Sequence, residues 1–291
     1  MDLFLQVIAN SIVLGSIYAV MAFGLVIVFG VMRVINFAHG VLAVLGAYAS
    51  LQLYRSLGID PFISLLVTVP LFFALGWLLY KILFSRLGPK SESTSMVVSF
   101  GVGIIIEVLI IMAWSANFQA ISLEYGTNVI SFGPVRLTYV RVISILIAFA
   151  TVIALTVFLA RAKLGKAIRA VIQDREAATY VGINVEHVAA VTFGIAIGSV
   201  ALGGVLLGSV YAFYPAVHLD WIGRLFAIVV LGGMGSISGA FVGAFIMAFA
   251  ESFVSLQFGS SWAPAVSFSL IILVLLLRPG GIAGVATAVR A

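Results

Sequence analysis

Charge is scarce in this sequence. Only 9% of its 291 residues are charged and 63% are hydrophobic, whereas a soluble domain carries about 25% charged residues. The apolar runs reach the length of about 20 residues that a membrane-crossing helix needs, and they lack the short alternation of β-barrel strands. We therefore predict an all-α polytopic membrane protein. Residues 1–291 would form one transmembrane domain of about eight spanning helices with broken or re-entrant half-helices.

Cysteine is absent, which excludes disulfides, thiolate metal sites and cysteine nucleophiles. The histidines His39, His187 and His218 lie in separate segments and predict no metal site. We find no paired acids, no activated serine and no G-x-x-x-x-G-K-[ST] phosphate loop, so we expect neither catalytic residues nor ATP hydrolysis by that route. The net charge of +5 does not indicate nucleic-acid binding, because the basic residues lie in short loops beside apolar runs.

Polar residues gather in one long stretch, residues 161–187. A charged side chain costs about 2.5–3.5 kcal/mol at the centre of a bilayer, so this stretch must lie in water. Its excess of basic residues predicts the cytoplasmic side. The loop that contains Arg86 and Lys90 and the tail from Arg278 are assigned to the same side. The loop 116–138 has one basic residue and is assigned to the outside.

Residues 165–187 have the spacing of a helix, with apolar residues such as Val171 and Val181 on one side and Gly182 as a stop. One interpretation is an amphipathic helix that lies on the bilayer. The acids Asp174 and Glu176 among the bases favour a surface that docks a protein partner, because a lipid-binding helix would avoid acids.

Two apolar runs are interrupted. RVINFAHG (33–40) divides the run 23–54, and GGMGSISG (232–239) divides the run 225–250. Each resulting piece is shorter than a membrane span. The similar layouts predict an internal repeat in which these two breaks correspond and line a translocation path.

A parity argument concerns the second half of the chain. Three apolar units, 188–213, 225–250 and 264–277, separate the two segments assigned to the cytoplasm, and 251–263 is expected to be a weakly charged loop. An even number of crossings must lie between segments on the same side. We therefore expect 225–250 to be a re-entrant pair of half-helices.

Few polar residues interrupt the apolar runs. The candidates for the translocation path are Asn36, His39, Glu107, Gly232, Gly233 and Gly235. An intramembrane carboxylate such as Glu107 is a functional candidate by default. The alternatives are a structural hydrogen bond to a neighbouring helix, or a protonated side chain that faces the subunit interface. Asn36 and His39 could line the path or satisfy free backbone groups at the break.

Glycine also recurs at four-residue spacing. The repeats are Gly204 and Gly208, and Gly235, Gly239 and Gly243. This spacing is typical of close helix packing, which we favour. The functional alternative makes Gly232, Gly233 and Gly235 a hinge in the path.

The sequence Glu176-Ala177-Ala178, followed by Gly182-Ile183, resembles the EAA loop of ABC-importer membrane subunits. Four blocks in order extend the resemblance to the LivH-type permeases of branched-chain amino-acid ABC importers. These blocks are INFAHG (35–40), LGAY (45–48), GKAIRAVIQDREAATYVGIN (165–184) and LGGMGSISGAFVGA (231–244). The match runs from near residue 6 to near residue 280, almost the whole chain.

This resemblance implies that residues 161–187 form a cytoplasmic coupling loop, seated in a groove of an ATPase, within a single transmembrane permease domain. The coupling residues would be Arg169, Asp174, Arg175, Glu176, Ala177, Ala178 and Gly182. The four charged residues would anchor the joint, the two alanines would allow close approach, and the glycine would end the helix.

The resemblance also implies partners. They are a second permease of the LivM type, two cytoplasmic ATPase subunits, and a periplasmic binding protein that delivers leucine, isoleucine or valine. The chain would lie in membrane lipid as a multi-pass protein of the bacterial inner membrane. ATP and magnesium would bind the ATPases, with no cofactor on this chain and no nucleic acid as a partner.

Other functions compete with this one. The nearest is the same permease type importing urea, short amides or other amino acids. A free-standing channel or secondary carrier would not need the EAA-like loop, and coupling to an ion gradient would favour more buried ionisable groups than Glu107. A membrane-embedded enzyme would need a catalytic constellation, and none is evident.

Overall fold

The computed structural model describes residues 2–87, 92–278 and 280–283. Its helices are α1 (Asp2–Met32), α2 (His39–Leu57), α3 (Pro61–Ile82), α4 (Glu92–Trp114), α5 (Tyr139–Arg161), α6 (Lys163–Gln173), α7 (Arg175–Tyr180), α8 (Val185–Val210), α9 (His218–Gly232), α10 (Ile237–Phe258) and α11 (Ala263–Leu277). Three 3-10 turns are η1 (Phe84–Arg86), η2 (Pro215–Val217) and η3 (Ser260–Trp262). Eight helical segments are long and apolar enough to cross a membrane, which confirms the predicted all-α polytopic class.

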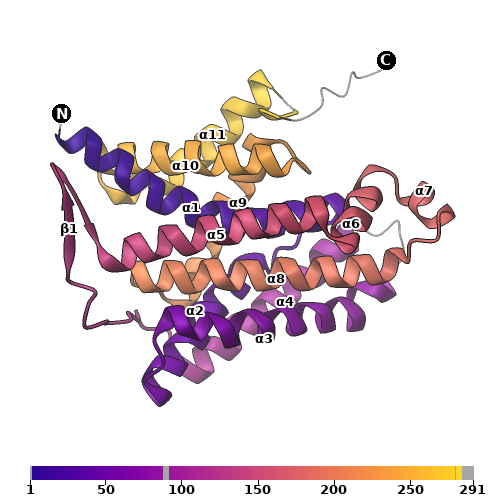
Figure 1. Cartoon of the computed structure of the whole chain (residues 1–291), viewed down its shortest axis with the longest axis horizontal. Helices are drawn as coiled ribbons and strands as arrows, with labels where there is room; N and C mark the ends of the chain where they lie inside the picture. The colour runs from indigo at the N-terminus through magenta and orange to yellow at the C-terminus, as the bar shows by residue number, and fades with distance from the viewer. Residues whose placement is uncertain (1, 88–91, 279, 284–291) are drawn as a thin grey trace.

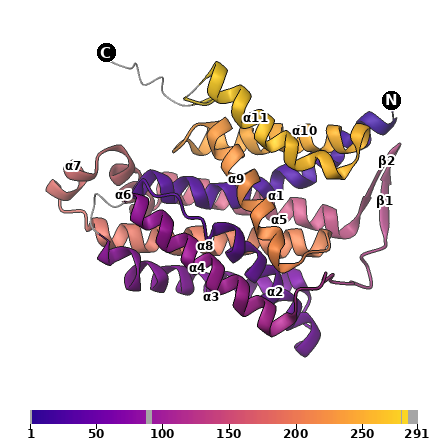
Figure 2. The ribbon, with the colours of Figure 1, turned by 180° about the vertical axis from the view of Figure 1, so that it is seen from behind.

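The bundle has two distinct ends (Figures 1 and 2). At one end lie α6 and α7, and we call it the basic end. At the other lies a short antiparallel hairpin of β1 (Val129–Phe132) and β2 (Val135–Thr138), and we call it the hairpin end. The basic end carries Arg33, Lys81, Arg86, Arg161, Lys163, Lys166, Arg169, Arg175 and Arg278, whereas Lys90, assigned to the same side, lies outside the described residues.

The hairpin end is tied down by polar contacts. The side chain of Gln6 on α1 both donates to and accepts from the backbone of Arg136 on β2. Tyr125 donates a hydrogen bond to Asp60, the N-cap of α3. Burial, and then the Asp60 carboxylate, raise the pKa of Tyr125 above its usual value, so the hydroxyl remains a donor at neutral pH. The loop before the hairpin is thereby held to the bundle.

Helices α1 and α8 form the centre of the bundle. In their most apolar windows, 83% and 89% of the residues are buried, against 17–28% in α3, α4, α5 and α11. A helix that is apolar on all sides is stable when other helices surround it, and a helix apolar on its exposed face suits lipid. Helix α3 packs along α8, and α10 packs along α1.

Glycine lets the central helices touch backbone to backbone. A Cβ at Gly204 on α8 would lie 1.9 Å from the carbonyl oxygen of Ala43 on α2. A Cβ at Gly239 would lie 1.9 Å from the carbonyl oxygen of Gly232, and one at Gly243 would lie 2.8 Å from that of Ile228. These contacts confirm, for Gly204, Gly239 and Gly243, the close helix packing that the four-residue spacing predicts.

The first break differs from its prediction. Helix α1 is continuous from Asp2 to Met32, so residues 23–31 are not a separate short piece. Residues 33–38 then fold back into the bundle, because His39 Nε2 lies 3.1 Å from the carbonyl oxygen of Met21, well before the end of α1. Helix α2 therefore starts inside the bundle and runs towards the hairpin end.

The counterpart of this break is the segment 211–217, not GGMGSISG. Helix α9 also starts inside the bundle, since a Cβ at Gly40 on α2 would lie 2.5 Å from the carbonyl oxygen of His218. From this meeting point α9 runs towards the basic end. The helix contacts fit an inverted repeat of α1–α4 and α8–α11, with a different correspondence from the predicted one: α3 packs on α8 as α10 packs on α1, and α4 packs on α2 as α11 packs on α9.

The region 225–250 also needs correction. Its glycine break is a tight turn, residues 233–236, that lies beside Gly30 and Ile172 at the basic end. The pair α9–α10 returns to the hairpin end, as the parity argument requires. However, α10 has 22 residues, about 33 Å at 1.5 Å per residue, and is not a half-helix.

The prediction of a loop at 251–263 is wrong for residues 251–258. Helix α10 continues to Phe258, and Glu251 is a buried residue of this helix. The charge of Glu251 made this segment look like a loop. In the structure Arg224 on α9 neutralises that charge, so the helix can continue through it.

We predict that Gly204→Ala lowers the melting temperature in detergent by about 5 °C or more, because the new Cβ meets backbone that cannot move aside. The matched control is Gly101→Ala on α4, where nothing lies within 4 Å of the Cβ position. There alanine should be neutral or stabilising by up to about 1 kcal/mol. Equal melting temperatures for the two variants would contradict the packing role of Gly204.

Candidate functional site

The predicted coupling segment is two helices, not one. Asp174 has extended backbone angles between α6 and α7, and its carboxylate accepts a hydrogen bond from the amide of Ala177 at 2.9 Å. This is an N-cap, which starts a new helix at the next residue. Gly182 then ends α7 with φ of +84°, a conformation that glycine adopts without strain.

The structure places the predicted coupling residues on different surfaces. Asp174, Arg175, Glu176, Ala177 and Gly182 are exposed on the outside of the basic end, whereas Ala178 is buried against the neighbouring turns. Arg169 points the other way. Its Nη2 donates to the carbonyl oxygen of Ala160 at 3.2 Å, at the end of α5, where a cation is favoured by the helix dipole.

Two exposed apolar residues complete this surface and were not among the predicted coupling residues. Tyr180 is 87% exposed and Val181 is 76% exposed, at the end of α7. The helical spacing assigned Val181 to the apolar side shared with Val171, but the break at Asp174 turns α7 away from that side. Exposed apolar side chains next to charges are characteristic of a protein interface.

A polar hollow of about 470 Å³ connects this surface to the central helix α1. Its lining includes Arg33 at the end of α1 and the α6–α7 junction from Gln173 to Glu176. A second hollow of about 280 Å³ beside it contains the turn between α9 and α10, with Gly30 and Ile172 opposite. Gly235 in this turn has φ of +88° and open space around it, in contrast to the packed glycines of α10.

The proposed hinge glycines therefore have different environments. Gly232 is in backbone contact with Gly239 and cannot gain a side chain without movement. Gly233 and Gly235 both have positive φ and form the turn itself. The turn faces Ile172 of α6 across the second hollow, which places it close to the predicted coupling segment.

The polar candidates of the first break lie inside the bundle, beside Gly40, which meets the start of α9. Asn36 and His39 are fully buried, and each contacts backbone: Asn36 Oδ1 accepts from the amide of Ala38 at 3.0 Å, and His39 Nε2 faces Met21. Asn36 Nδ2 and His39 Nδ1 have no hydrogen-bond partner among the described residues. These contacts agree with the alternative in which Asn36 and His39 satisfy free backbone groups at the break. One side-chain nitrogen of each residue remains without a partner among the described residues.

Glu107 on α4 faces the start of α9. Its Oε2 lies 3.1 Å from His218 Nε2, close enough for an ion pair if the histidine is protonated, although the two groups are not aligned as a hydrogen bond. The Glu107 side chain is 23% exposed. The structure therefore shows a close approach of α4 and α9 at this carboxylate, but not the predicted alternative of a hydrogen bond, with His218.

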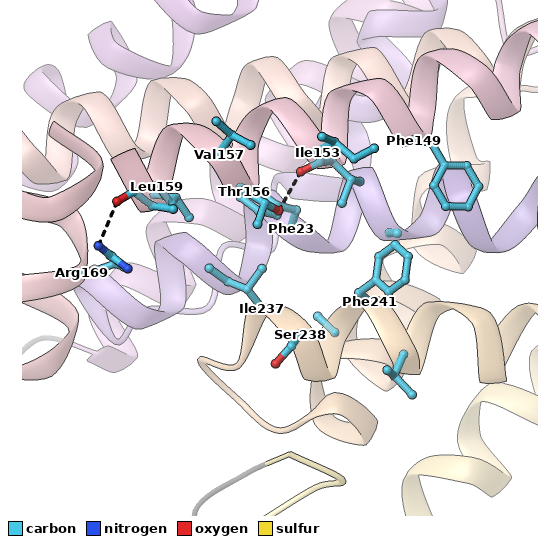
Figure 3. A pocket seen from close by; sticks show the side chains of 15 residues that line it. Phe23, Phe149, Ile153, Thr156, Val157, Leu159, Arg169, Ile237, Ser238 and Phe241 are labelled. Atoms are coloured by element: carbon cyan, nitrogen blue, oxygen red, sulfur yellow. Dashed lines mark hydrogen bonds between the residues drawn. The ribbon is translucent and has the colours of Figure 1, made fainter. Parts of the chain in front are cut away.

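A large apolar groove runs between α5 and α10 across α1 (Figure 3). It has a volume of about 680 Å³ and extends from Arg169 at the basic end to Phe149 and Phe241. Beyond these rings, Phe245 covers Gly15 of α1, and the three phenylalanine rings lie with centroids 4.9–6.3 Å apart. The aromatic cluster closes the groove towards the hairpin end.

A buried charged cluster was missed from the sequence. Glu251 on α10 accepts hydrogen bonds from Arg224 Nε at 2.8 Å, Tyr18 at 2.9 Å and Ser267 at 3.2 Å. The side chains of Glu251 and Arg224 are 5% and 14% exposed. The signal that could have revealed the cluster is the pairing of one acid and one base on adjacent apolar helices, because each charge is costly at membrane depth without the other.

We predict that Glu251→Ala destabilises the protein by about 3–5 kcal/mol, because Arg224 would remain buried without its counter-ion. Glu186→Ala is the control, since it breaks an exposed pair with Lys81 worth about 1 kcal/mol or less. The double variant Glu251→Leu, Arg224→Leu should recover much of the loss. Thermal unfolding in detergent measures all three, and a mild effect of Glu251→Ala would refute the internal pair.

Comparison with known proteins bears on the whole chain. The family model for the permease component of branched-chain amino acid transport systems matches residues 7–276. The high-affinity branched-chain amino acid permease LivH of Escherichia coli K12 is 32% identical, over 97% of this chain and 96% of its own length. The corresponding permease BraD of Pseudomonas aeruginosa is 30% identical over the same shares, and a probable LivH of Methanocaldococcus jannaschii is 25% identical over 96% of this chain and 92% of its own length.

No solved structure gave a significant match to the chain. The sequence relationships nevertheless agree with the eight apolar helices of the fold. This multi-pass membrane protein therefore belongs to the family of branched-chain amino acid transport permeases.

Proposed function

We propose that this chain is the membrane-spanning permease subunit of an ATP-driven importer for leucine, isoleucine and valine. The main observation behind the proposal is the surface formed by α7 and its flanking residues. This surface is exposed, contains both acidic and basic residues, and ends in the exposed apolar side chains of Tyr180 and Val181. Such a surface suits a protein partner, and the family relationship suggests that the partner belongs to a transport system.

The contacts around α6 suggest how force would pass from this surface into the bundle. α7 is attached to α6 through the Asp174 cap. Ile172 of α6 packs on Gly30 of α1, where a Cβ would lie 3.1 Å from its Cδ1. The same Ile172 borders the α9–α10 turn. Closure of two ATPases on α7 would therefore push on both inverted halves at one point.

In this proposal residues 1–291 form one permease domain in the inner membrane of a bacterium, with the coupling loop 161–187 in the cytoplasm. The concentration of Lys and Arg at the basic end supports this orientation. Two ATPase subunits bind ATP and magnesium below the basic end. A second, LivM-type permease completes the pathway, and a periplasmic binding protein delivers the substrate at the hairpin end.

The proposal is tested by reconstitution. The chain is co-expressed with the second permease, two ATPases and the binding protein, and ATP hydrolysis is measured in liposomes. We expect leucine-loaded binding protein to stimulate hydrolysis. Stimulation by urea or a short amide instead would change the substrate, and failure to form a complex would refute the importer assignment.

We predict that Gly182→Asp abolishes substrate-stimulated hydrolysis while the complex still inserts into the membrane. Gly182 has φ of +84° with open space around it, so a side chain strains the end of α7 without a clash. Gly58→Asp is a matched control, because Gly58 has φ of +66°, open space and a position at the opposite end of the bundle. Equal stimulation in both variants would show that α7 does not couple.

A further inference from the structure

A pocket of about 560 Å³, with mainly apolar walls and four charged side chains, lies on the hairpin side of the aromatic cluster. It is formed by the first half of α1, the start of α5, the segment 211–217, the start of α9 and the second half of α10. On α1 its lining ends at Tyr18, and the apolar groove of Figure 3 begins at Ala19. The pocket and the groove therefore succeed one another along α1, and Phe245 packs on Gly15 in the last turn of α1 that lines the pocket.

Four charged side chains line this pocket: Arg141, Asp220, Arg224 and Glu251. Arg224 and Glu251 neutralise each other. Arg141 makes one side-chain hydrogen bond, from Nη1 to Asn10 Oδ1 at 3.1 Å, and neither it nor Asp220 forms an ion pair with another described residue. The pocket thus holds one cation and one anion that form no ion pair with each other or with another described residue, although Asp220 lies within electrostatic range of Arg224.

The position of Arg141 is unfavourable for the helix that carries it. Arg141 lies in the first turn of α5, where the helix dipole disfavours a cation. Asp220 lies in the first turn of α9, where the dipole favours an anion. Helix stability therefore explains Asp220 but not Arg141, which indicates that the guanidinium serves another purpose.

The remaining walls are largely apolar with single polar groups. Leu14, Leu207 and Trp221 contribute apolar surface from three different helices. Ser252 also lines the pocket, and its buried hydroxyl has no hydrogen-bond partner among the described residues. The volume falls within the range of about 300–1,000 Å³ that is common for small-molecule sites.

We infer that this pocket binds a free α-amino acid as its zwitterion, with the carboxylate on Arg141, the ammonium on Asp220 and an aliphatic side chain against Leu14, Leu207 and Trp221. A guanidinium is suited to bind a carboxylate through two hydrogen bonds, and a carboxylate accepts from an ammonium. Urea or a short amide would leave both charges unpaired. This inference rests on the proposed function. It places a substrate-binding site in the part of the pathway that lies on the hairpin side of the aromatic cluster.

The first test is binding of radiolabelled leucine to the purified permease pair with its ATPases, without the binding protein. Arg141→Gln and Asp220→Asn should each weaken binding about tenfold or more, as expected for loss of a charge-assisted contact. Arg136→Gln is the control, because it removes an exposed cation at the same end, outside the pocket. Binding unchanged by either pocket substitution would overturn the inference.

The second test begins with the unmutated complex and compares leucine with two analogues. 3-Methylbutylamine lacks the carboxylate of leucine, and 4-methyl-2-oxopentanoate lacks its ammonium. Both should compete at least about tenfold less well than leucine. In Asp220→Asn the disadvantage of the oxo acid should shrink to about threefold or less, a change that a purely structural role would not produce. Equal competition by all three ligands would refute the zwitterion site.

These outcomes separate the inference from the proposed function. If leucine-loaded binding protein stimulates ATP hydrolysis while the pocket variants bind leucine normally, the importer stands and the pocket is not the site. If the complex responds to urea and not to leucine, the proposed substrate and this site fail together.

Discussion

The fold depends on the place where two helices begin inside the bundle. In an apolar interior the free amides at a helix start have no water to bind, so the surrounding protein must supply their partners. At α2 the Asn36 side chain supplies one, to the amide of Ala38, and His39 is fixed against Met21. The start of α9 sits directly on Gly40. Each broken segment therefore supports the other, and both require the glycine contacts that bring α2 and α8 together.

From that meeting point the two halves reach opposite ends of the molecule. α2 leads to the loops of the hairpin end, and α9 leads to the glycine turn, which faces α6 across a hollow. Ile172 of α6 packs on Gly30 of α1 and lines the hollow beside the turn. The proposed coupling surface at the basic end is thus connected, through helices, to the proposed binding pocket at the other end. This arrangement suits a protein that exposes a substrate alternately to two sides.

Hydrophobic length and local charge could be interpreted correctly from the sequence, whereas features that depend on tertiary contacts could not. The helical class, the polar stretch at 161–187 and the packing glycines could be recognised, because each depends on local composition or spacing. The α6–α7 break could not, since the cap of Asp174 competes locally with a continuous helix. The sequence favours a loop at Glu251 because its counter-ion, Arg224, is on another helix. The correspondence between the two halves depends on which helices pack together, and the order of apolar runs along the sequence does not show that.

The inversion has a consequence for biogenesis. Helices α3 and α10 are equivalent, with 22 residues each, yet they insert in opposite directions. Their apolar surfaces favour neither direction, because hydrocarbon is the same on both sides of its midplane. What distinguishes them is that α3 ends near Lys81 and Arg86, whereas α10 ends in Phe258 and Gly259 without a nearby cation in the sequence. Orientation in such a chain is a property of a few loop cations, each contributing about 1 kcal/mol at an anionic membrane surface, rather than of the helices that they flank.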